Sequence, residues 1–146
     1  MPCSLTVSPA HGLAFFRFWG VVTADEGRDA FIKYVEHPDF DPRYAMLSDA
    51  RAVSNVDADF RTVMTKVDAL TDRLRKFKQT TLSTVLVKNS VAFGMARMLG
   101  TLLYKDSNIR IAVTTSETEA LESASVSFPT IDALTLSLGL QPWEAQ

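Results

Sequence analysis

The sequence predicts an α/β fold: a single domain with a mixed, mostly parallel sheet of about five strands and with helices packed on it. Three observations lead to this prediction. Short apolar, β-branched segments alternate along the chain with segments whose apolar residues recur at helical spacing. Two apolar runs near the N-terminus are separated by only a short loop, which indicates a hairpin. The length of 146 residues suits one domain, so we expect residues 1–146 to share one core.

The N-terminal hairpin is predicted from Leu5–Val7 and Leu13–Val22, which flank a loop containing proline and glycine. Aromatic side chains alternate onto both faces of the second run, so we expect this strand to lie inside the sheet rather than at a bare edge. Thr23 and Glu26 then form a capping box, in which each side chain accepts a hydrogen bond from the other residue's amide. This predicts a helix that runs to about Glu36.

The middle of the chain is predicted to hold two buried strands and one long helix. After the turn His37–Pro42, the segment Tyr44–Leu47 is a short buried strand whose end carries an acid and a base. Apolar residues spaced three and four apart from Asp57 to Lys78 predict one continuous helix. Leu82–Val87 is nearly all apolar and β-branched, the pattern of a strand that is buried on both faces.

The C-terminal third continues the alternation of helices and strands. We expect a helix from Asn89 to about Tyr104, a strand at Ile109–Val113, a helix at Glu117–Ser123 behind a second capping box at Ser116–Glu119, and a last helix at about Pro129–Leu138. Strands that alternate with helices in this way imply a parallel arrangement with right-handed crossovers.

Composition excludes several classes of function. A net charge of −2 gives no basic excess for binding nucleic acid. The single cysteine, Cys3, excludes an internal disulfide and a thiolate-rich metal site, and it fits a reducing cytoplasm. No segment has the pattern of a secretory signal or the length of a membrane span. The only histidines, His11 and His37, lie in separate loops, and no phosphate-binding or nucleophile motif occurs, so we expect no enzyme, no metal and no cofactor.

One edge of the sheet is a candidate binding site. In open α/β domains the C-terminal ends of parallel strands lie at one edge, where ligands usually bind, and helix N-termini there favour anions. Three loops are expected to meet at this edge, and they carry the candidate residues Asp49, Arg51, Asn89, Ser90, Thr115 and Ser116. A structural role is the alternative: Asn89 and Ser116 are typical N-caps, and Asp49 and Arg51 can form an ion pair.

A ridge of small side chains runs along the helix that starts near Asn89. Ala92, Ala96 and Gly100 recur at every fourth position, and larger apolar residues, two methionines among them, flank the ridge. Small side chains at this spacing let another backbone approach closely. The neighbour is either the sheet of the same chain or, alternatively, a second subunit or a ligand, so these residues are candidates for a homodimer or pocket surface.

The order of elements resembles the SpoIIAA-like branch of the STAS family over nearly the whole chain. The segment Gly20–Thr23, which opens the first helix, and the turn His37–Pro42 contribute to this resemblance. It implies a compact α/β domain for regulation or binding, a class that is sometimes compared with CRAL-TRIO lipid carriers. Phosphoregulated antagonists carry an Asp-Ser pair after the third strand, and the serine accepts the phosphate. Here Asp49 matches the acid but Ala50 replaces the serine, so the resemblance does not extend to a phosphorylation switch.

Three functions of different classes follow from these observations. The first is a non-enzymatic regulatory or protein-binding module, which the resemblance and the missing catalytic motifs favour. The second is a carrier of a small apolar ligand or lipid, with a pocket between the methionine-containing helix and the sheet. The third, an enzyme, has no catalytic constellation behind it. We expect a cytoplasmic protein.

Overall fold

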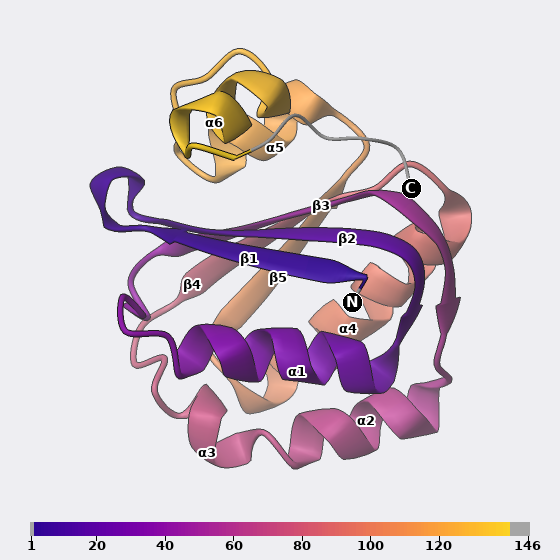
Figure 1. Cartoon of the computed structure of the whole chain (residues 1–146). Helices are drawn as coiled ribbons and strands as arrows, with labels where there is room; N and C mark the ends of the chain where they lie inside the picture. Colours follow the sequence, from indigo (N-terminus) through magenta and orange to yellow (C-terminus); the bar gives the residue numbers. More distant parts are fainter. Residues whose placement is uncertain (1, 141–146) are drawn as a thin grey trace.

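The computed structural model describes residues 2–140, which form one five-stranded sheet between two layers of helices (Figure 1). The strands are β1 (Cys3–Ser8), β2 (Leu13–Thr23), β3 (Ala45–Asp57), β4 (Thr81–Leu86) and β5 (Ile109–Thr114). The helices are α1 (Ala24–Val35), α2 (Phe60–Asp68), α3 (Thr71–Leu74), α4 (Ser90–Asp106), α5 (Glu117–Ser123) and α6 (Ile131–Ser137), and a 3-10 turn (Pro9–His11) lies in the hairpin loop.

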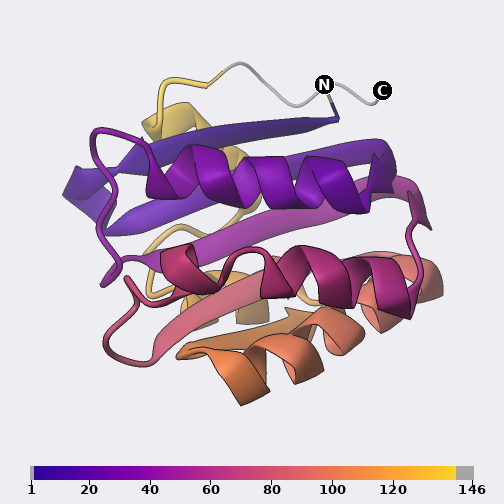
Figure 2. The same cartoon turned by 90° about the horizontal axis from the view of Figure 1, so that it is seen from below.

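The sheet confirms the predicted mixed, mostly parallel topology. Its strands lie in chain order, with β1 antiparallel to β2 and every other neighbouring pair parallel. Helices α1 to α4 cover one face of the sheet, and α5 and α6 cover the other (Figures 1 and 2). From β2 to β5, each new strand is added next to the previous one in the same direction across the sheet. Right-handed crossovers then place all the connecting helices, α1 to α4, on one face.

The N-terminal hairpin and the helix after it form as predicted. β2 lies between β1 and β3, inside the sheet, and its neighbouring residues Phe15 and Phe16 are buried in the cores on opposite faces. The Thr23 amide donates to Glu26 Oε1 at 2.9 Å, and the Glu26 amide donates to Thr23 Oγ1 at 3.2 Å. Both halves of the first capping box are therefore present, and they fix the start of α1.

β3 is much longer than the predicted Tyr44–Leu47 strand. It continues to Asp57 because the end of β2 stays paired with it as far as Thr23, across two register shifts in the pairing. The prediction that Asp49 and Arg51 lie in a loop after a short strand is wrong. Both residues lie in the middle of β3 instead.

The long helix predicted from Asp57 to Lys78 is divided into α2 and α3. At the break, the Leu70 amide donates to the Val67 carbonyl, three residues back, so the α-helical ladder is interrupted. The apolar stripe still packs inward on both sides of the break, but Phe60 and Met64 at its start are exposed. The apolar spacing therefore predicted correctly which side of this segment is buried. The prediction that the segment is one continuous helix is wrong.

The core has one part on each side of the sheet. Under α1 to α4, Phe16 of β2 packs with Tyr34 of α1, and their rings meet edge to face with centroids 5.9 Å apart. Under α5 and α6, Phe15 of β2 packs with Leu86 of β4 and Leu134 of α6. The alternation of adjacent β2 residues thus divides the core as the sequence predicts.

Candidate functional site

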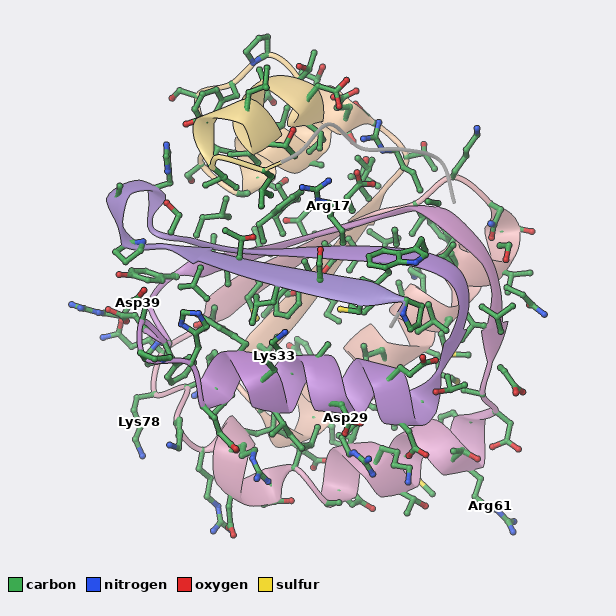
Figure 3. The ribbon with its side chains drawn as sticks, viewed as in Figure 1. Arg17, Asp29, Lys33, Asp39, Arg61 and Lys78 are labelled. Atoms are coloured by element: carbon green, nitrogen blue, oxygen red, sulfur yellow. The ribbon has the colours of Figure 1, made fainter. Side chains whose placement is uncertain are left out.

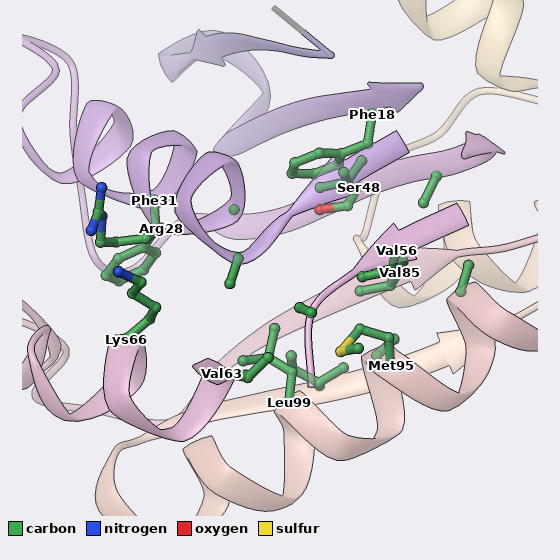
Figure 4. Close-up of a pocket in the computed structure, with 18 of the residues that line it drawn as sticks. Phe18, Arg28, Phe31, Ser48, Val56, Val63, Lys66, Val85, Met95 and Leu99 are labelled. Carbon is green, nitrogen blue, oxygen red and sulfur yellow. The ribbon is translucent and has the colours of Figure 1, made fainter. Parts of the chain in front are cut away.

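An apolar cavity of about 260 Å³ lies between the sheet and the helices α1, α2 and α4 (Figure 4). Side chains from four strands and from these helices form its wall, among them Phe18, Phe31, Val85, Met95, Leu99 and Ile111. Nearly all of these groups are hydrocarbon, so the cavity favours an apolar occupant over water.

The cavity exists because small residues face one another across the core. On the sheet side, β3 presents Ser48 and Ala50 and β4 presents Ser83 to the cavity. On the helix side, Ala92 and Ala96 of α4 lie opposite, and both are almost fully buried. Facing short side chains leave volume that larger residues would have filled.

Ser48 places a polar group in this apolar wall. The residue is only 8 % exposed, and its hydroxyl oxygen points into the cavity (Figure 4). Within residues 2–140 this hydroxyl forms no hydrogen bond. Because the hydroxyl faces the cavity, a ligand that carries a polar atom can form a hydrogen bond with it.

Two cations stand at the rim of the cavity, where α1 and α2 face each other. Arg28 of α1 and Lys66 of α2 both line the cavity, and each side chain keeps 29 % of its surface exposed. Lys66 Nζ lies 2.7 Å from Asp25 Oδ1, and Arg28 Nη1 lies 3.3 Å from the same oxygen. Asp25 thus connects the two cations, and the hydrogen bond from Lys66 holds the pKa of Asp25 below its ordinary value.

On the opposite face of the sheet, Asp49 and Arg51 form an ion pair that supports α5. Arg51 Nε and Nη2 each lie 2.9 Å from a carboxylate oxygen of Asp49, and Arg51 Nη1 lies 3.5 Å from Glu117 Oε2. Glu117 in turn accepts a hydrogen bond from the Ile131 amide, at the start of α6. The hydrogen bonds to Asp49 raise the pKa of Arg51.

Arg17 belongs to the same charged cluster, and the sequence analysis did not single it out. It is a buried residue of β2, paired with Asp49 in the parallel register, and it lies on the side of the sheet covered by α5 and α6 (Figure 3). Its guanidinium carbon lies 5.7 Å from the centre of the Phe15 ring. Burial lowers the pKa of Arg17, while the charges of Asp49 and Asp132 oppose this shift.

The register aligns Asp49 with Leu86 at the end of β4 and Leu86 with Thr114 at the end of β5, although β3 itself continues past this level to Asp57. Asn89 is the N-cap of α4, where Oδ1 accepts from the Ala92 amide at 2.9 Å and Nδ2 donates to the Val53 carbonyl at 2.8 Å. These bonds use both polar atoms of the side chain for structure.

Ser116 caps α5 by accepting from the Glu119 amide at 3.2 Å, but the second half of the predicted capping box is not formed. The carboxylate of Glu119 accepts from Thr114 Oγ1 instead, and the Ser116 amide donates to that same hydroxyl oxygen. Ser90 and Thr115 are exposed. Ligand binding by this edge stays a prediction.

The small-residue ridge of α4 faces the interior of its own chain. Ala92 and Ala96 form part of the cavity wall, as the pocket alternative predicted. At Gly100 a Cβ atom would lie 3.2 Å from Cβ of Ile111, so α4 approaches β5 closely at this point. Ala96 and Gly100 also line a groove beside β5 together with Tyr104, and the homodimer stays a prediction.

Comparison with known proteins gives matches to solved structures only. No family model matches the chain, and no curated protein matches it. An uncharacterized protein of the DUF3478 family from Shewanella loihica PV-4, described as having a SpoIIAA-like fold, aligns with 82 % of this chain and 91 % of its own, at 10 % identity and a TM-score of 0.51. An anti-sigma factor antagonist from Mycobacterium paratuberculosis aligns over 84 % and 94 %, at 15 % identity and a TM-score of 0.52. The chain has a SpoIIAA-like fold.

In this SpoIIAA-like fold, the Asp49-Ala50 pair lies within β3, and its two side chains point to opposite faces of the sheet. Ala50 is buried and lines the cavity, whereas Asp49 lies in the ion pair with Arg51. No helix among residues 2–140 has both the length and the apolar character to cross a membrane.

Ser48, Arg28 and Lys66 are polar residues of the cavity that the sequence did not identify as candidates. A local signal existed for the two cations. Arg28 lies three residues before the core residue Phe31, and Lys66 lies three residues after Val63, so both share the inward side of an amphipathic helix.

Proposed function

We propose that this protein is a non-enzymatic binding module that holds a small apolar ligand in the cavity between its helices and its sheet. The cavity itself is the observation that supports the proposal. Protein interiors are normally packed as densely as organic crystals, with few voids larger than a water molecule. An apolar cavity of about 260 Å³ in one small domain is therefore an unusual feature, and a ligand would account for it.

The volume sets the size of the ligand. An engineered apolar cavity of about 150 Å³ accepts benzene, and pockets for drug-sized ligands start at about 300 Å³. The cavity of about 260 Å³ lies between these values. Scaling from benzene gives a ligand with about ten non-hydrogen atoms inside the cavity.

Affinity follows from the area that such a ligand buries. A chain of about ten methylene groups gains roughly 8 kcal/mol on leaving water. Association costs translational and rotational freedom, which lowers this gain. We therefore expect a dissociation constant no tighter than about 1 μM.

Isothermal titration calorimetry with 1-decanol, a neutral ligand of suitable size, tests the proposal. We expect saturable binding to the wild type. Ala96→Leu adds three carbons to the cavity wall and should weaken binding about tenfold or more, because the ligand loses that volume. Ala69→Leu makes the same change at an exposed position at the end of α2 and should leave binding unchanged.

A protein-binding regulatory module is the second candidate function. The similarity of fold to an anti-sigma factor antagonist favours it. Ala50, which replaces the acceptor serine of phosphoregulated antagonists, argues that such a module would not be switched by phosphate at this position. We include in this second proposal a cytoplasmic location, which agrees with the single, half-buried Cys3. We also include a homodimer.

The titration separates the two candidates. Saturable binding that Ala96→Leu weakens and Ala69→Leu does not supports the ligand-binding function. A folded wild type that binds neither 1-decanol nor its carboxylate analogue decanoate ends that proposal and leaves the protein-binding module.

A further inference from the structure

The charged residues at the rim of the cavity indicate which head group the ligand carries. This step rests on the ligand-binding function proposed above. The cavity wall is hydrocarbon except for a few polar groups, and the charged ones among these are Arg28 and Lys66. Both come from helices on the same side of the cavity, and their side chains lie near each other (Figure 4). A ligand in the cavity would therefore meet positive charge at this rim.

The acids that pair with these cations lie outside the cavity. Asp25 and Asp29 do not line it, and their side chains are 61 % and 53 % exposed. Arg28 Nη2 lies 2.9 Å from Asp29 Oδ1, and Lys66 Nζ lies 2.7 Å from Asp25 Oδ1. The carboxylates thus lie toward solvent, whereas Arg28 and Lys66 line the cavity.

An incoming anion can join or replace these carboxylates. Exposed ion pairs contribute little to stability, so their rearrangement costs little. An ammonium has three N–H donors and a guanidinium has five, so Lys66 and Arg28 can donate to a second acceptor while they remain paired. Their half-buried position strengthens such a bond over one formed in water.

We infer that the ligand is an amphiphilic monocarboxylate, with its carboxylate at Arg28 and Lys66 and its apolar body in the cavity. The limit of about ten non-hydrogen atoms inside the cavity corresponds to the hydrocarbon chain of a medium-chain fatty acid such as decanoate, whose carboxylate lies at the rim. The apolar body lies among Phe31, Met95 and Leu99, beyond the rim. The Ser48 hydroxyl provides a further polar contact for a ligand that carries an oxygen along its chain.

A pair of ligands that differ only in the head group provides the test. We measure the binding of decanoate and 1-decanol by calorimetry, below the concentration at which decanoate forms micelles. Decanoate is the more water-soluble of the two, so hydrophobic burial alone would favour 1-decanol. The inference predicts that the wild type binds decanoate at least as tightly as 1-decanol.

Charge variants at the rim identify the residues responsible. Lys66→Gln and Arg28→Gln should each weaken decanoate binding by about fivefold to tenfold and leave 1-decanol binding within about twofold. Lys33→Gln on α1 and Arg73→Gln on α3 are matched controls that remove a cation away from the cavity, and they should change neither affinity. Asp25→Asn removes the carboxylate that competes for both cations and should strengthen decanoate binding.

Each outcome is decisive. If 1-decanol binds and the rim variants affect both ligands equally, or if 1-decanol binds more tightly than decanoate, the head-group inference is wrong while the ligand-binding function stands. If neither ligand binds, the ligand-binding function itself fails. Because Asp25→Asn is expected to gain affinity, and a misfolded variant would lose it, this result does not depend on how well Lys66→Gln and Arg28→Gln fold.

Discussion

Arg51 holds both carboxylate oxygens of Asp49, two residues before it in β3, with Nε and Nη2 each 2.9 Å from an oxygen. Asp49 is only 5 % exposed. The same arrangement recurs between Arg43 and Asp41, where Nε lies 3.0 Å and Nη2 lies 2.7 Å from the carboxylate oxygens, but the Arg43 side chain is 80 % exposed. The protein therefore contains a buried and an exposed version of one ion pair.

Loss of Arg51 should destabilise the protein. Arg51→Gln leaves the buried carboxylate of Asp49 without its bidentate partner, and removing one member of a buried pair typically costs about 3–5 kcal/mol. Arg51 is only half-buried, so we expect a value near the lower end in urea denaturation. Arg43→Gln is the matched control and should leave the unfolding midpoint unchanged. Equal effects of the two substitutions would show that the Asp49 pair is not a structural one.

Truncation of Leu86 should be costly because this β4 residue is fully buried under α5 and α6. Leu86→Ala is expected to lower the free energy of unfolding by about 2–5 kcal/mol. Leu136→Ala removes the same atoms from an exposed position of α6 and should have a small effect. A loss below about 1 kcal/mol for Leu86→Ala in denaturant melts would mean that β4 is peripheral.

Two glycines of α4 should respond differently to alanine. A Cβ added at Gly94 meets open space, so Gly94→Ala should stabilise the protein by about 0.5–1 kcal/mol through helix propensity. A Cβ added at Gly100 meets Cβ of Ile111 at 3.2 Å, so Gly100→Ala should gain less or lose stability. Thermal melts of the two variants compare them directly. Equal gains would indicate that α4 does not approach β5 closely.

The thiol of Cys3 should react slowly in the folded protein. Burial raises its pKa from 9.0 to about 11. At pH 8.5 the folded chain then carries roughly a hundredfold less thiolate than the unfolded chain, and the thiolate is the reactive form. Iodoacetamide should therefore modify the protein far more slowly in buffer than in urea, as followed by mass spectrometry. Similar alkylation rates in buffer and in urea would contradict the assigned burial.

The same pKa shift of Cys3 should make the stability of the fold depend on pH. Above pH 9 the thiol of the unfolded chain loses its proton before the thiol of the folded chain does, so the free energy of unfolding should fall between about pH 9 and pH 11.

The sequence predicted the order of elements because the signals for them are local. Alternation in β2, the Thr23–Glu26 capping box and the apolar run of β4 each depend on residues close together in the chain. The length of β3 was not predictable in this way, because it depends on β2 remaining paired across two register shifts. The break between α2 and α3 was missed since the apolar stripe continues through it.

The candidate site was predicted only in part. The possible ion pair of Asp49 and Arg51 and the N-cap role of Asn89 were foreseen from residue type and spacing. The cavity depends on the summed volumes of side chains from several elements, which no single segment reveals. Ala92 and Ala96 were identified as small residues at a possible pocket, but the facing Ser48 becomes significant only when β3 is placed opposite α4.

A crystal structure with 10-bromodecan-1-ol is the most direct test of the ligand-binding function. The bromine atom gives an anomalous signal that locates the apolar end of the ligand without reference to the rest of the density. We predict a bromine peak inside the cavity, among Phe31, Met95 and Leu99, and a weaker peak in crystals of Ala96→Leu soaked at the same ligand concentration. A bromine peak only on the outer surface, or a cavity that stays empty at saturating ligand, would contradict the proposal.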